Sequence, residues 1–407
     1  MTVDAVDLRA PAPFEPLPIQ RLVTLAGLIV LLVGAFFLRE QGWRHAALFL
    51  TGGLMGLALY HAAFGFSAAY RRLFLQRDGR GVQAQLLMLA AGTMLFAPVL
   101  AEGSLFGQSM TGAIAPVGVQ VAVGAFMFGI GMQLGGGCGS GTLFTVGGGS
   151  VRMLVTLAAM CAGSFWASLD MQWWSSLPRA PGIALGAELG WSVAALLQLT
   201  VFGAFWWLLR RYFSTSSPVV RPTLSRFFRG GWPLLWGALA LALLNWLALV
   251  LSGHPWSITW AFTLWGAKAA QLVGWDPTGT WFWSGGFTKY ALNNNILVDE
   301  TSVMDFGIVL GALVAAGLAG KYRPGFRIPL ASLLAAVLGG LMMGYGARIA
   351  YGCNIGAFFS GIASTSLRGW LWIVAALCGT WIGVKIRPLF GFSDEAAGET
   401  PAAGRSE

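Results

Sequence analysis

Long apolar runs, separated by short polar segments, follow one another along most of the chain. A helix needs about 20 consecutive apolar residues to cross the hydrocarbon core of a bilayer. The pattern therefore predicts an all-α polytopic membrane protein with about ten transmembrane helices. We expect these helices at residues 19–38, 45–62, 81–101, 117–133, 152–168, 191–209, 233–251, 303–320, 329–347 and 369–386.

The composition agrees with this fold class. Charged residues make up 10% of the chain and hydrophobic residues 56%, whereas about 25% of residues are charged in an ordinary soluble domain. The 57 glycines fit a membrane protein, in which small residues allow close helix packing and mark broken helices. The four cysteines give no sign of a disulfide framework, since none lies in a long exterior loop.

Lysine and arginine are distributed unevenly along the chain. They gather in the two tails and in the segments 71–80, 210–231 and 321–327, which fall on one side of the membrane when successive helices alternate in direction. Because cytoplasmic loops are enriched in basic residues, we expect a multi-pass protein, surrounded by lipid, with both termini in the cytoplasm. The net charge of +9 then reflects topology, and no nucleic-acid partner is expected.

Residues 254–302 are rich in tryptophan but are interrupted by Pro255, Pro277 and the polar run "YALNNNILVDET" at 290–301. We expect this region not to span the membrane. It forms either a short helix that enters the membrane partway or a platform at the interface.

One interrupted stretch occurs twice. Residues 124–142 read "GAFMFGIGMQLGGGCGSGT" and residues 339–357 read "GGLMMGYGARIAYGCNIGA". When Cys138 is aligned on Cys353, several glycines coincide, and the helices that precede the two motifs run in opposite directions. This pattern predicts an inverted-topology repeat, typical of transporters whose broken helices meet near the middle of the bilayer. Broken backbone at that depth is tolerated only where it is buried in protein or lines a cavity, so we expect both cysteines to line a path.

The repeat divides the chain into five segments. We expect a cytoplasmic tail at 1–18, the first inverted repeat at 19–168, connecting helices with the basic loop 210–231 at 169–302, the second-repeat core at 303–386, and a cytoplasmic tail at 387–407. The motif "GGGCGSG" lies in the first repeat and "GCNIGAFFSG" in the second.

The two motifs also carry a family resemblance. "GGGCGSGT" at 135–142 and "GYGARIAYGCNIGAFFSGIASTSLRGW" at 344–370 resemble the YeeE/YedE family of membrane proteins, which carry thiosulfate and related sulfur or selenium compounds into bacteria. The resemblance implies an hourglass-like central constriction, short helices whose ends meet there, and a cytoplasmic TusA-like sulfur carrier as acceptor. The family also has a cysteine in a stretch like "RFCF", where this chain has "AFGF" at 63–66, with Gly65 at the position of the cysteine.

The residues expected to line the path lie in and beside the two motifs: Cys138, Cys353, Gly136, Gly137, Gly139, Ser140, Gly352, Asn354, Gly356, Gln133 and Arg348. A thiol is a weak hydrogen-bond donor, which suits a carrier that must release a soft sulfur anion. Exposed N–H groups of the glycines, and short helices that begin within 139–142 or 354–358, attract anions without a tightly binding lysine. Arg348 serves either this path or the outer membrane interface.

Other candidates are weaker. Cys161 and Cys378 fall in the middle of predicted helices and are expected to pack there, while Arg152 and Arg368 are expected to anchor helix ends. Lys289 and Asn294 are candidates for an outer vestibule. No metal or other cofactor is expected, because neither motif contains histidine and two cysteines alone make a poor zinc site.

The acidic residues are expected in tails, loops and helix ends, with Asp305 nearest to membrane depth. Proton-coupled carriers use carboxylates inside the membrane. The sequence therefore favours either facilitated passage, driven by consumption of the anion inside the cell, or entry of a less charged species.

Three functions fit these features. The first is uptake of a small sulfur-containing anion, most simply thiosulfate, and the second is transport of selenium compounds or other sulfur species. The third is a membrane-embedded sulfurtransferase with persulfides on Cys138 and Cys353, which would need a base beside each thiol. Because His45, His61 and His254 lie far from both motifs in the sequence, we expect a transporter and not an enzyme.

Overall fold

The ten long helices predicted from the apolar runs are present in the computed structural model, which describes residues 17–215 and 223–392. Their ends agree with the predicted ends to within about three residues. They are α1 (Arg21–Leu38), α2 (Trp43–Ala62), α4 (Arg80–Glu102), α5 (Val119–Gly135), α7 (Val151–Leu169), α10 (Trp191–Tyr212), α12 (Leu234–Ser252), α15 (Glu300–Leu318), α16 (Leu330–Ile349) and α18 (Leu367–Ile386). The expectations for 1–16, 216–222 and 393–407 lie outside the described residues.

Shorter elements connect these helices. The α-helices are α3 (Phe66–Gln76), α6 (Gly139–Gly147), α8 (Met171–Ser176), α9 (Leu185–Leu189), α11 (Leu224–Arg229), α13 (Thr259–Leu272), α14 (Gly286–Asn293) and α17 (Ser360–Ala363). The others are the π-helix η4 (Asn354–Phe359) and the 3₁₀-helices η1 (Arg39–Gln41), η2 (Pro277–Gly279), η3 (Ile296–Val298) and η5 (Arg387–Phe390). Two antiparallel strand pairs join β1 (Ser104–Leu105) to β2 (Gln108–Ser109) and β3 (Val117–Gly118) to β4 (Arg179–Ala180).

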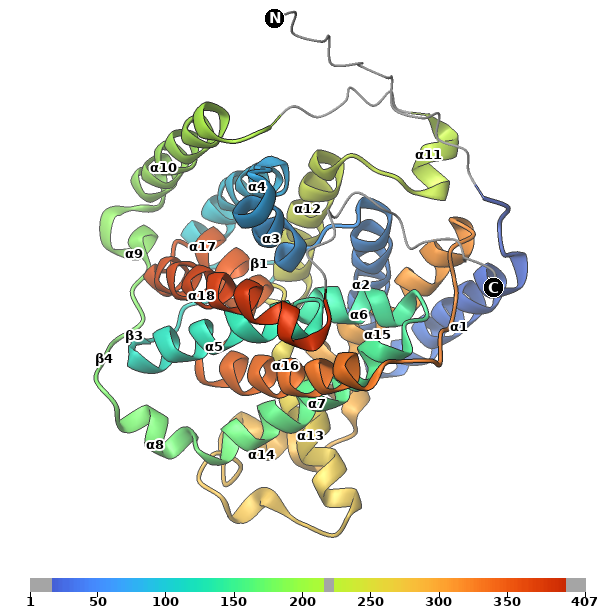
Figure 1. Cartoon of the computed structure of the whole chain (residues 1–407). Helices are drawn as coiled ribbons and strands as arrows, with labels where there is room; N and C mark the ends of the chain where they lie inside the picture. Colours follow the sequence, from blue (N-terminus) through green and yellow to red (C-terminus); the bar gives the residue numbers. More distant parts are fainter. Residues whose placement is uncertain (1–16, 216–222, 393–407) are drawn as a thin grey trace, which may run out of the picture.

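The region 254–302 contains α13, α14 and two single-turn helices, and none of these is long enough to cross a membrane. This confirms that the region does not span. Figure 1 shows α13 and α14 together at one end of the molecule.

At the centre of the molecule, equivalent helices of the two halves make equivalent contacts. Helix α5 packs along α16, and each also packs along the last helix of the other half, α5 along α18 and α16 along α7. At the periphery α1 and α10 lie at opposite edges of the molecule (Figure 1). Only 22% of the most apolar stretch of each of these two helices is buried, against 72% for α15. Such an exchange of equivalent contacts is what a pseudo-two-fold axis produces.

The equivalence extends beyond the two motifs. Helix α2 packs on α15 as α12 packs on α4, and α1 packs on α15 as α10 packs on α4. Helix α3 contacts α4, α5 and α18, while α13 contacts the corresponding α15, α16 and α7. By these contacts α10, α12 and α13, in the predicted connecting region 169–302, take part in the repeat.

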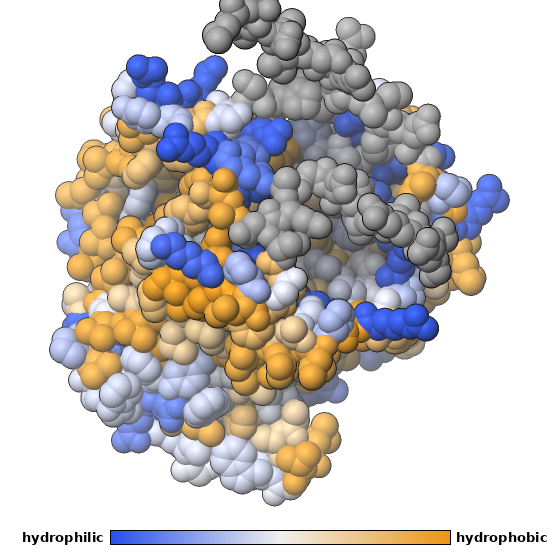
Figure 2. Space-filling view, in the orientation of Figure 1, coloured by the Kyte–Doolittle hydropathy of each residue, from blue (hydrophilic) through white to orange (hydrophobic). Residues whose placement is uncertain are grey.

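The surface is suited to lipid. Along α1 the exposed side chains are large and apolar, among them Leu22, Ile29 and Phe36. Figure 2 shows hydrophobic residues over much of the face in view, with hydrophilic residues at its rims. Burial of these faces in a bilayer removes the apolar surface from water.

Glycines allow the buried helices to approach one another closely. On α15, Gly307 lies against the carbonyl oxygen of Phe49 and Gly311 against that of Gly53, both on α2. On α5, Gly131 lies against the carbonyl of Gly339 on α16. Small residues at such contacts are the usual means of close helix packing in membranes, where no hydrophobic effect drives helices together.

The packing of α2 on α15 predicts that Gly311→Ala destabilises the protein. The new Cβ would overlap the carbonyl oxygen of Gly53, and such overpacking costs about 1–3 kcal/mol. Thermal unfolding in detergent micelles should show a lower midpoint. In the control variant Gly203→Ala on α10, the added Cβ meets no atom within 4 Å, so the midpoint should stay the same or rise. Equal midpoints for the two variants would contradict the packing described.

Candidate functional site

Both motifs break a long helix in the same way. Helix α5 ends at Gly135 and is followed by Gly136, with a φ of +91°. Helix α16 ends at Ile349, three residues before Gly352, whose φ is +146°; glycine tolerates both values. Cys138, two residues after Gly136, is the N-cap of α6. Cys353, one residue after Gly352, is the N-cap of η4, which continues into α17. The short helices expected within 139–142 and 354–358 are therefore present.

The structure brings the two cysteines to one place. Both are buried, with exposed fractions of 1% for Cys138 and 0% for Cys353. A side chain at Gly139, the residue after Cys138, would begin 3.4 Å from the sulfur of Cys353. The sulfur of Cys138 lies 3.4 Å from the hydroxyl of Ser140, and that of Cys353 accepts a hydrogen bond of 3.5 Å from the N–H of Ile355.

Helices from both halves begin beside these cysteines. The N–H of Phe66, the first residue of α3, acts on the sulfur of Cys138. On the other side Thr259, the first residue of α13, lies beside Gly139, and Ser257 lies beside Gly356. The starts of α3, α6, η4 and α13 thus converge around the two sulfurs. Because a helix N-terminus presents free N–H groups and partial positive charge, this arrangement favours an anion.

Two equivalent arginines hold the broken ends. Arg152 donates to the carbonyl of Gly135 (2.7 Å) and Arg368 to that of Tyr351 (2.6 Å), each 17 residues earlier in the chain. Arg152 also bonds the carbonyl of Leu134, and Arg368 that of Gly356. The sequence predicted that both arginines anchor helix ends; the structure shows that they satisfy the carbonyl groups freed by each break.

Arg348 lies over two neighbouring aromatic rings, with its guanidinium 5.2 Å from the centre of the Phe282 ring and 6.0 Å from that of Trp260. Its Nε is buried without a hydrogen-bond partner. Its charge acts on that of Arg368, and neither makes an ion pair with an acidic residue among those that the structure describes. Two positive charges without a carboxylate make this part of the protein attractive to anions.

Comparison with known proteins agrees with this geometry. Residues 61–382 match the model of a protein family described as "Sulphur transport". The chain belongs to this family. It is 29% identical over 358 residues to the thiosulfate transporter TsuA of Spirochaeta thermophila, a match covering 82% of this chain and 96% of the relative. It is 26% identical to the TsuA of Escherichia coli, covering 83% and 94%, and 31% identical to the probable transporter YedE of Escherichia coli, covering 39% of each.

The chain is thus a membrane transport protein of the sulphur transport family, and not an enzyme. This confirms the resemblance noted from the two motifs.

Three buried polar side chains in or near the two motifs have an atom without a hydrogen-bond partner among the described residues. Asn354 places its Nδ2 3.6 Å from the sulfur of Met132, and its Oδ1 has no partner. Gln133 donates to the carbonyl of Ser67 (3.1 Å), and its Oε1 has no partner. The buried hydroxyl of Tyr70 is also without a partner and lies within electrostatic reach of Cys138. Tyr70 was missed from the sequence because α3 is too short and polar to be predicted as a span.

The remaining candidates are two cysteines and two glycines. Cys161 is half-buried on α7, whereas Cys378 is exposed on α18, so the expectation that Cys378 packs inside the protein is wrong. Gly65 is the N-cap of α3, where an added Cβ would meet only the Cβ of Ala68 at 3.9 Å. Gly137 lies against the side chain of Met153, where an added Cβ would be 3.1 Å from its methyl group.

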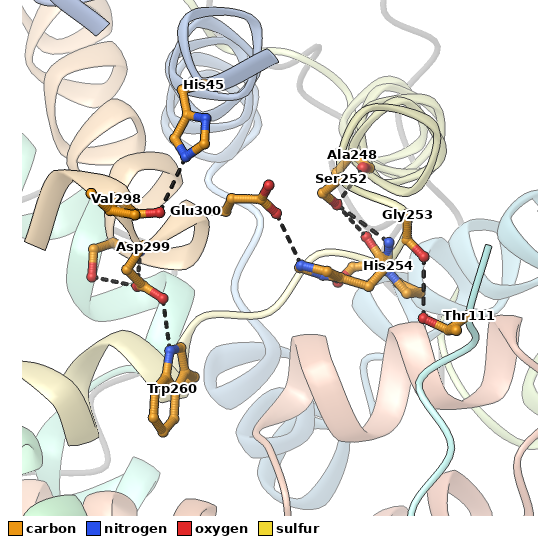
Figure 3. A network of polar contacts seen from close by, with 12 residues as sticks. His45, Thr111, Ala248, Ser252, Gly253, His254, Trp260, Val298, Asp299 and Glu300 are labelled. Carbon is orange, nitrogen blue, oxygen red and sulfur yellow. Dashed lines mark hydrogen bonds and ion pairs between the residues drawn. The ribbon is translucent and has the colours of Figure 1, made fainter. Parts of the chain in front are cut away.

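A cavity of about 280 Å³ lies beside α14, η3 and the start of α15. Asn294 lines it, but Lys289 is exposed on α14 and does not. Figure 3 shows the polar contacts here, including His254 Nε2 at 3.1 Å from Glu300 Oε2. Burial alone lowers the pKa of His254, but the hydrogen bond and charge of Glu300 outweigh it and raise the pKa above its ordinary value. The carboxylates of Asp299 and Glu300 line this cavity.

Asp305 corrects the expectation that no carboxyl group lies deep in the protein. Its exposed fraction is 0%, and neither carboxyl oxygen has a hydrogen-bond partner within the described part of the chain. Its charge acts on the sulfurs of Cys161 and Cys353. The sequence placed Asp305 near a helix end; α15 begins at Glu300, and the helices packed around it cause the burial.

Proposed function

We propose that this protein takes up a small sulfur-containing anion, most simply thiosulfate, across the bacterial inner membrane. The observation that carries the proposal is the convergence of four helix starts around Cys138 and Cys353. Two relatives that align over most of their length are named thiosulfate transporters, which supports the choice of anion. The path consists of the two cysteines with Gly136, Gly137, Gly139, Ser140, Gly352, Asn354, Gly356, Gln133 and Arg348.

The site holds its anion weakly enough to release it. The N–H groups of α6 and η4, and the thiols of the two cysteines, are neutral donors, and the thiols offer a soft contact to the terminal sulfur of thiosulfate. A thiolate about 4 Å from one unit of substrate charge would instead cost roughly 4 kcal/mol at an effective dielectric of 20. The thiols therefore act in their protonated form, and Arg348 with Arg368 draws the anion toward Cys353.

The three histidines are held away from the sulfurs. His45 contacts the carbonyl of Val298, His61 lies beside Gly230, and His254 pairs with Glu300. No histidine is thus placed to activate the thiols as persulfide carriers. Selenium compounds and other sulfur anions share the soft chemistry of thiosulfate, and competition of selenite and sulfate with labelled thiosulfate in proteoliposomes distinguishes them.

Removal of either central thiol should abolish most transport. Cys138→Ala and Cys353→Ala lose the soft donor, and Cys→Ser replaces it with a hard hydroxyl that binds water. Uptake of labelled thiosulfate should therefore fall at least tenfold in each variant, which corresponds to the loss of about 1.4 kcal/mol of interaction. Stability should change by only ~1 kcal/mol, as thermal unfolding can check. Cys378→Ala, on an exposed position, is the control and should keep its activity. If the Cys138→Ser, Cys353→Ser double variant took up thiosulfate at the wild-type rate, the two thiols would have no role in transport.

We also propose that the side of the basic segments, which includes Arg77, Arg210 and Lys321, faces the cytoplasm, where a TusA-like carrier receives the sulfur. The positive-inside rule supports this orientation. Both termini are cytoplasmic in this orientation.

Cysteine labelling tests the orientation. In a background with Cys378→Ala, a cysteine introduced at Ser214 or Ser225 should resist membrane-impermeant thiol reagents in intact cells and react after lysis. Asp276, exposed on the opposite side near η2, supplies the matched control Asp276→Cys, which should react in intact cells. The reverse labelling pattern would show that the proposed orientation is wrong.

A further inference from the structure

The carboxyl group of Asp305 is a buried titratable group that the proposed transport path does not use. It is wholly buried, and neither oxygen has a hydrogen-bond partner among the residues that the structure describes. A charge in such surroundings is costly, and the group takes up a proton instead. Ionisable residues buried within membrane segments are rare and often belong to proton relays.

Its position relates it to the substrate site. Helix α15, which carries Asp305, packs against α6 and α13, and these two helices begin at Cys138 and beside Gly139. The charge of Asp305 acts on the sulfur of Cys353. A carboxyl group here therefore senses an anion bound at the two cysteines.

Among the residues that the structure describes, the charge that acts on Asp305 is the negative charge of Asp299 at the start of α15. Asp305 acts in turn on the sulfurs of Cys161 on α7 and of Cys353. Charged groups on the neighbouring elements contact other residues. His45 on α2 contacts Val298, Lys268 on α13 contacts Leu292 and Asn294, and His254 contacts Glu300. Arg226 on α11 contacts Gly231, and Arg21 on α1 lies beside the far end of α15. Helix α6 contains no titratable residue.

We propose that Asp305 is the proton-binding site that couples anion uptake to proton entry. The proposal rests on the transport function proposed above. A proton from the outer solution forms an O–H bond with one carboxylate oxygen of Asp305, and that bond breaks when the proton leaves to the inner solution; no electron is transferred. An anion at the cysteines favours the protonated carboxyl, and by linkage the bound proton favours anion binding by the same factor.

Uptake of labelled thiosulfate into proteoliposomes holding the full-length protein tests the coupling. A more acidic outer solution should drive accumulation, and each proton carried contributes about tenfold for one unit of pH difference. A pH dye trapped in the lumen should report acidification when thiosulfate is added outside. Wild-type uptake without either effect would overturn the coupling alone, whereas absence of any thiosulfate uptake would overturn the transport function itself.

Asp305→Asn separates the residue from the rest of the site. This neutral variant should lose pH-driven accumulation, so that the gradient no longer raises the internal concentration above the external one. It should retain exchange of internal unlabelled for external labelled thiosulfate, which requires no net proton movement. Asp276→Asn, at an exposed position near η2, is the matched control and should behave as the wild type.

Two outcomes would contradict the role of Asp305. One is pH-driven accumulation by Asp305→Asn at the wild-type level, and the other is loss of exchange together with accumulation in a variant that is folded. Thermal unfolding establishes folding, and Asp305→Ser, a smaller neutral variant, gives the same test if the amide is not accommodated.

Discussion

The breaks in the two central helices are possible only because their freed backbone groups find partners inside the protein. Where α5 and α16 stop, the carbonyl groups of Gly135 and Tyr351 receive hydrogen bonds from Arg152 and Arg368. At the starts of α6 and η4 the N–H groups lie beside the two cysteines, and the sulfur of Cys353 accepts a hydrogen bond from the N–H of Ile355. At each break, the carbonyl groups at the end of the long helix are satisfied within the protein. The N–H groups at the start of the short helix that follows are left for an anion.

The same constraint explains why glycine and arginine occur together in both motifs. Gly136 and Gly352 supply the backbone conformation for the turn, and a side chain at Gly136 would begin 2.6 Å from the guanidinium of Arg152. The close contact of α5 with α16 at Gly131 holds the two broken helices against each other. The two halves meet the constraint in the same way, and their equivalent contacts bring both positive ends to one place.

Much of this architecture follows from the sequence. The apolar runs determined the ten spans, because membrane helices must satisfy their backbone internally and be apolar for their whole length. The repeated motif identified Cys138, Cys353 and the short helices that follow them. Helix α3 and the hydroxyl of Tyr70 could not be predicted in this way, since α3 is short and amphipathic and its burial comes from α4, α5 and α18.

Burial of single polar side chains was the other quantity that the sequence could not supply. Asp305 lies near the start of its helix, and only the packing of α2, α6 and α13 around α15 removes it from solvent. The opposite holds for Cys378, which lies in the middle of α18 but on its exposed side. Periodicity in an all-apolar helix does not distinguish the face toward lipid from the face toward protein.

The central claim is that Cys138 and Cys353 lie together at one site, and cross-linking tests it most directly. In the Cys161→Ala, Cys378→Ala background, a short thiol reagent with two reactive ends should join the two cysteines. Mass spectrometry of the digested protein should then find their peptides linked by one reagent molecule, and prior thiosulfate should slow the reaction. Separate adducts on both cysteines, with no linked peptide, would contradict the account.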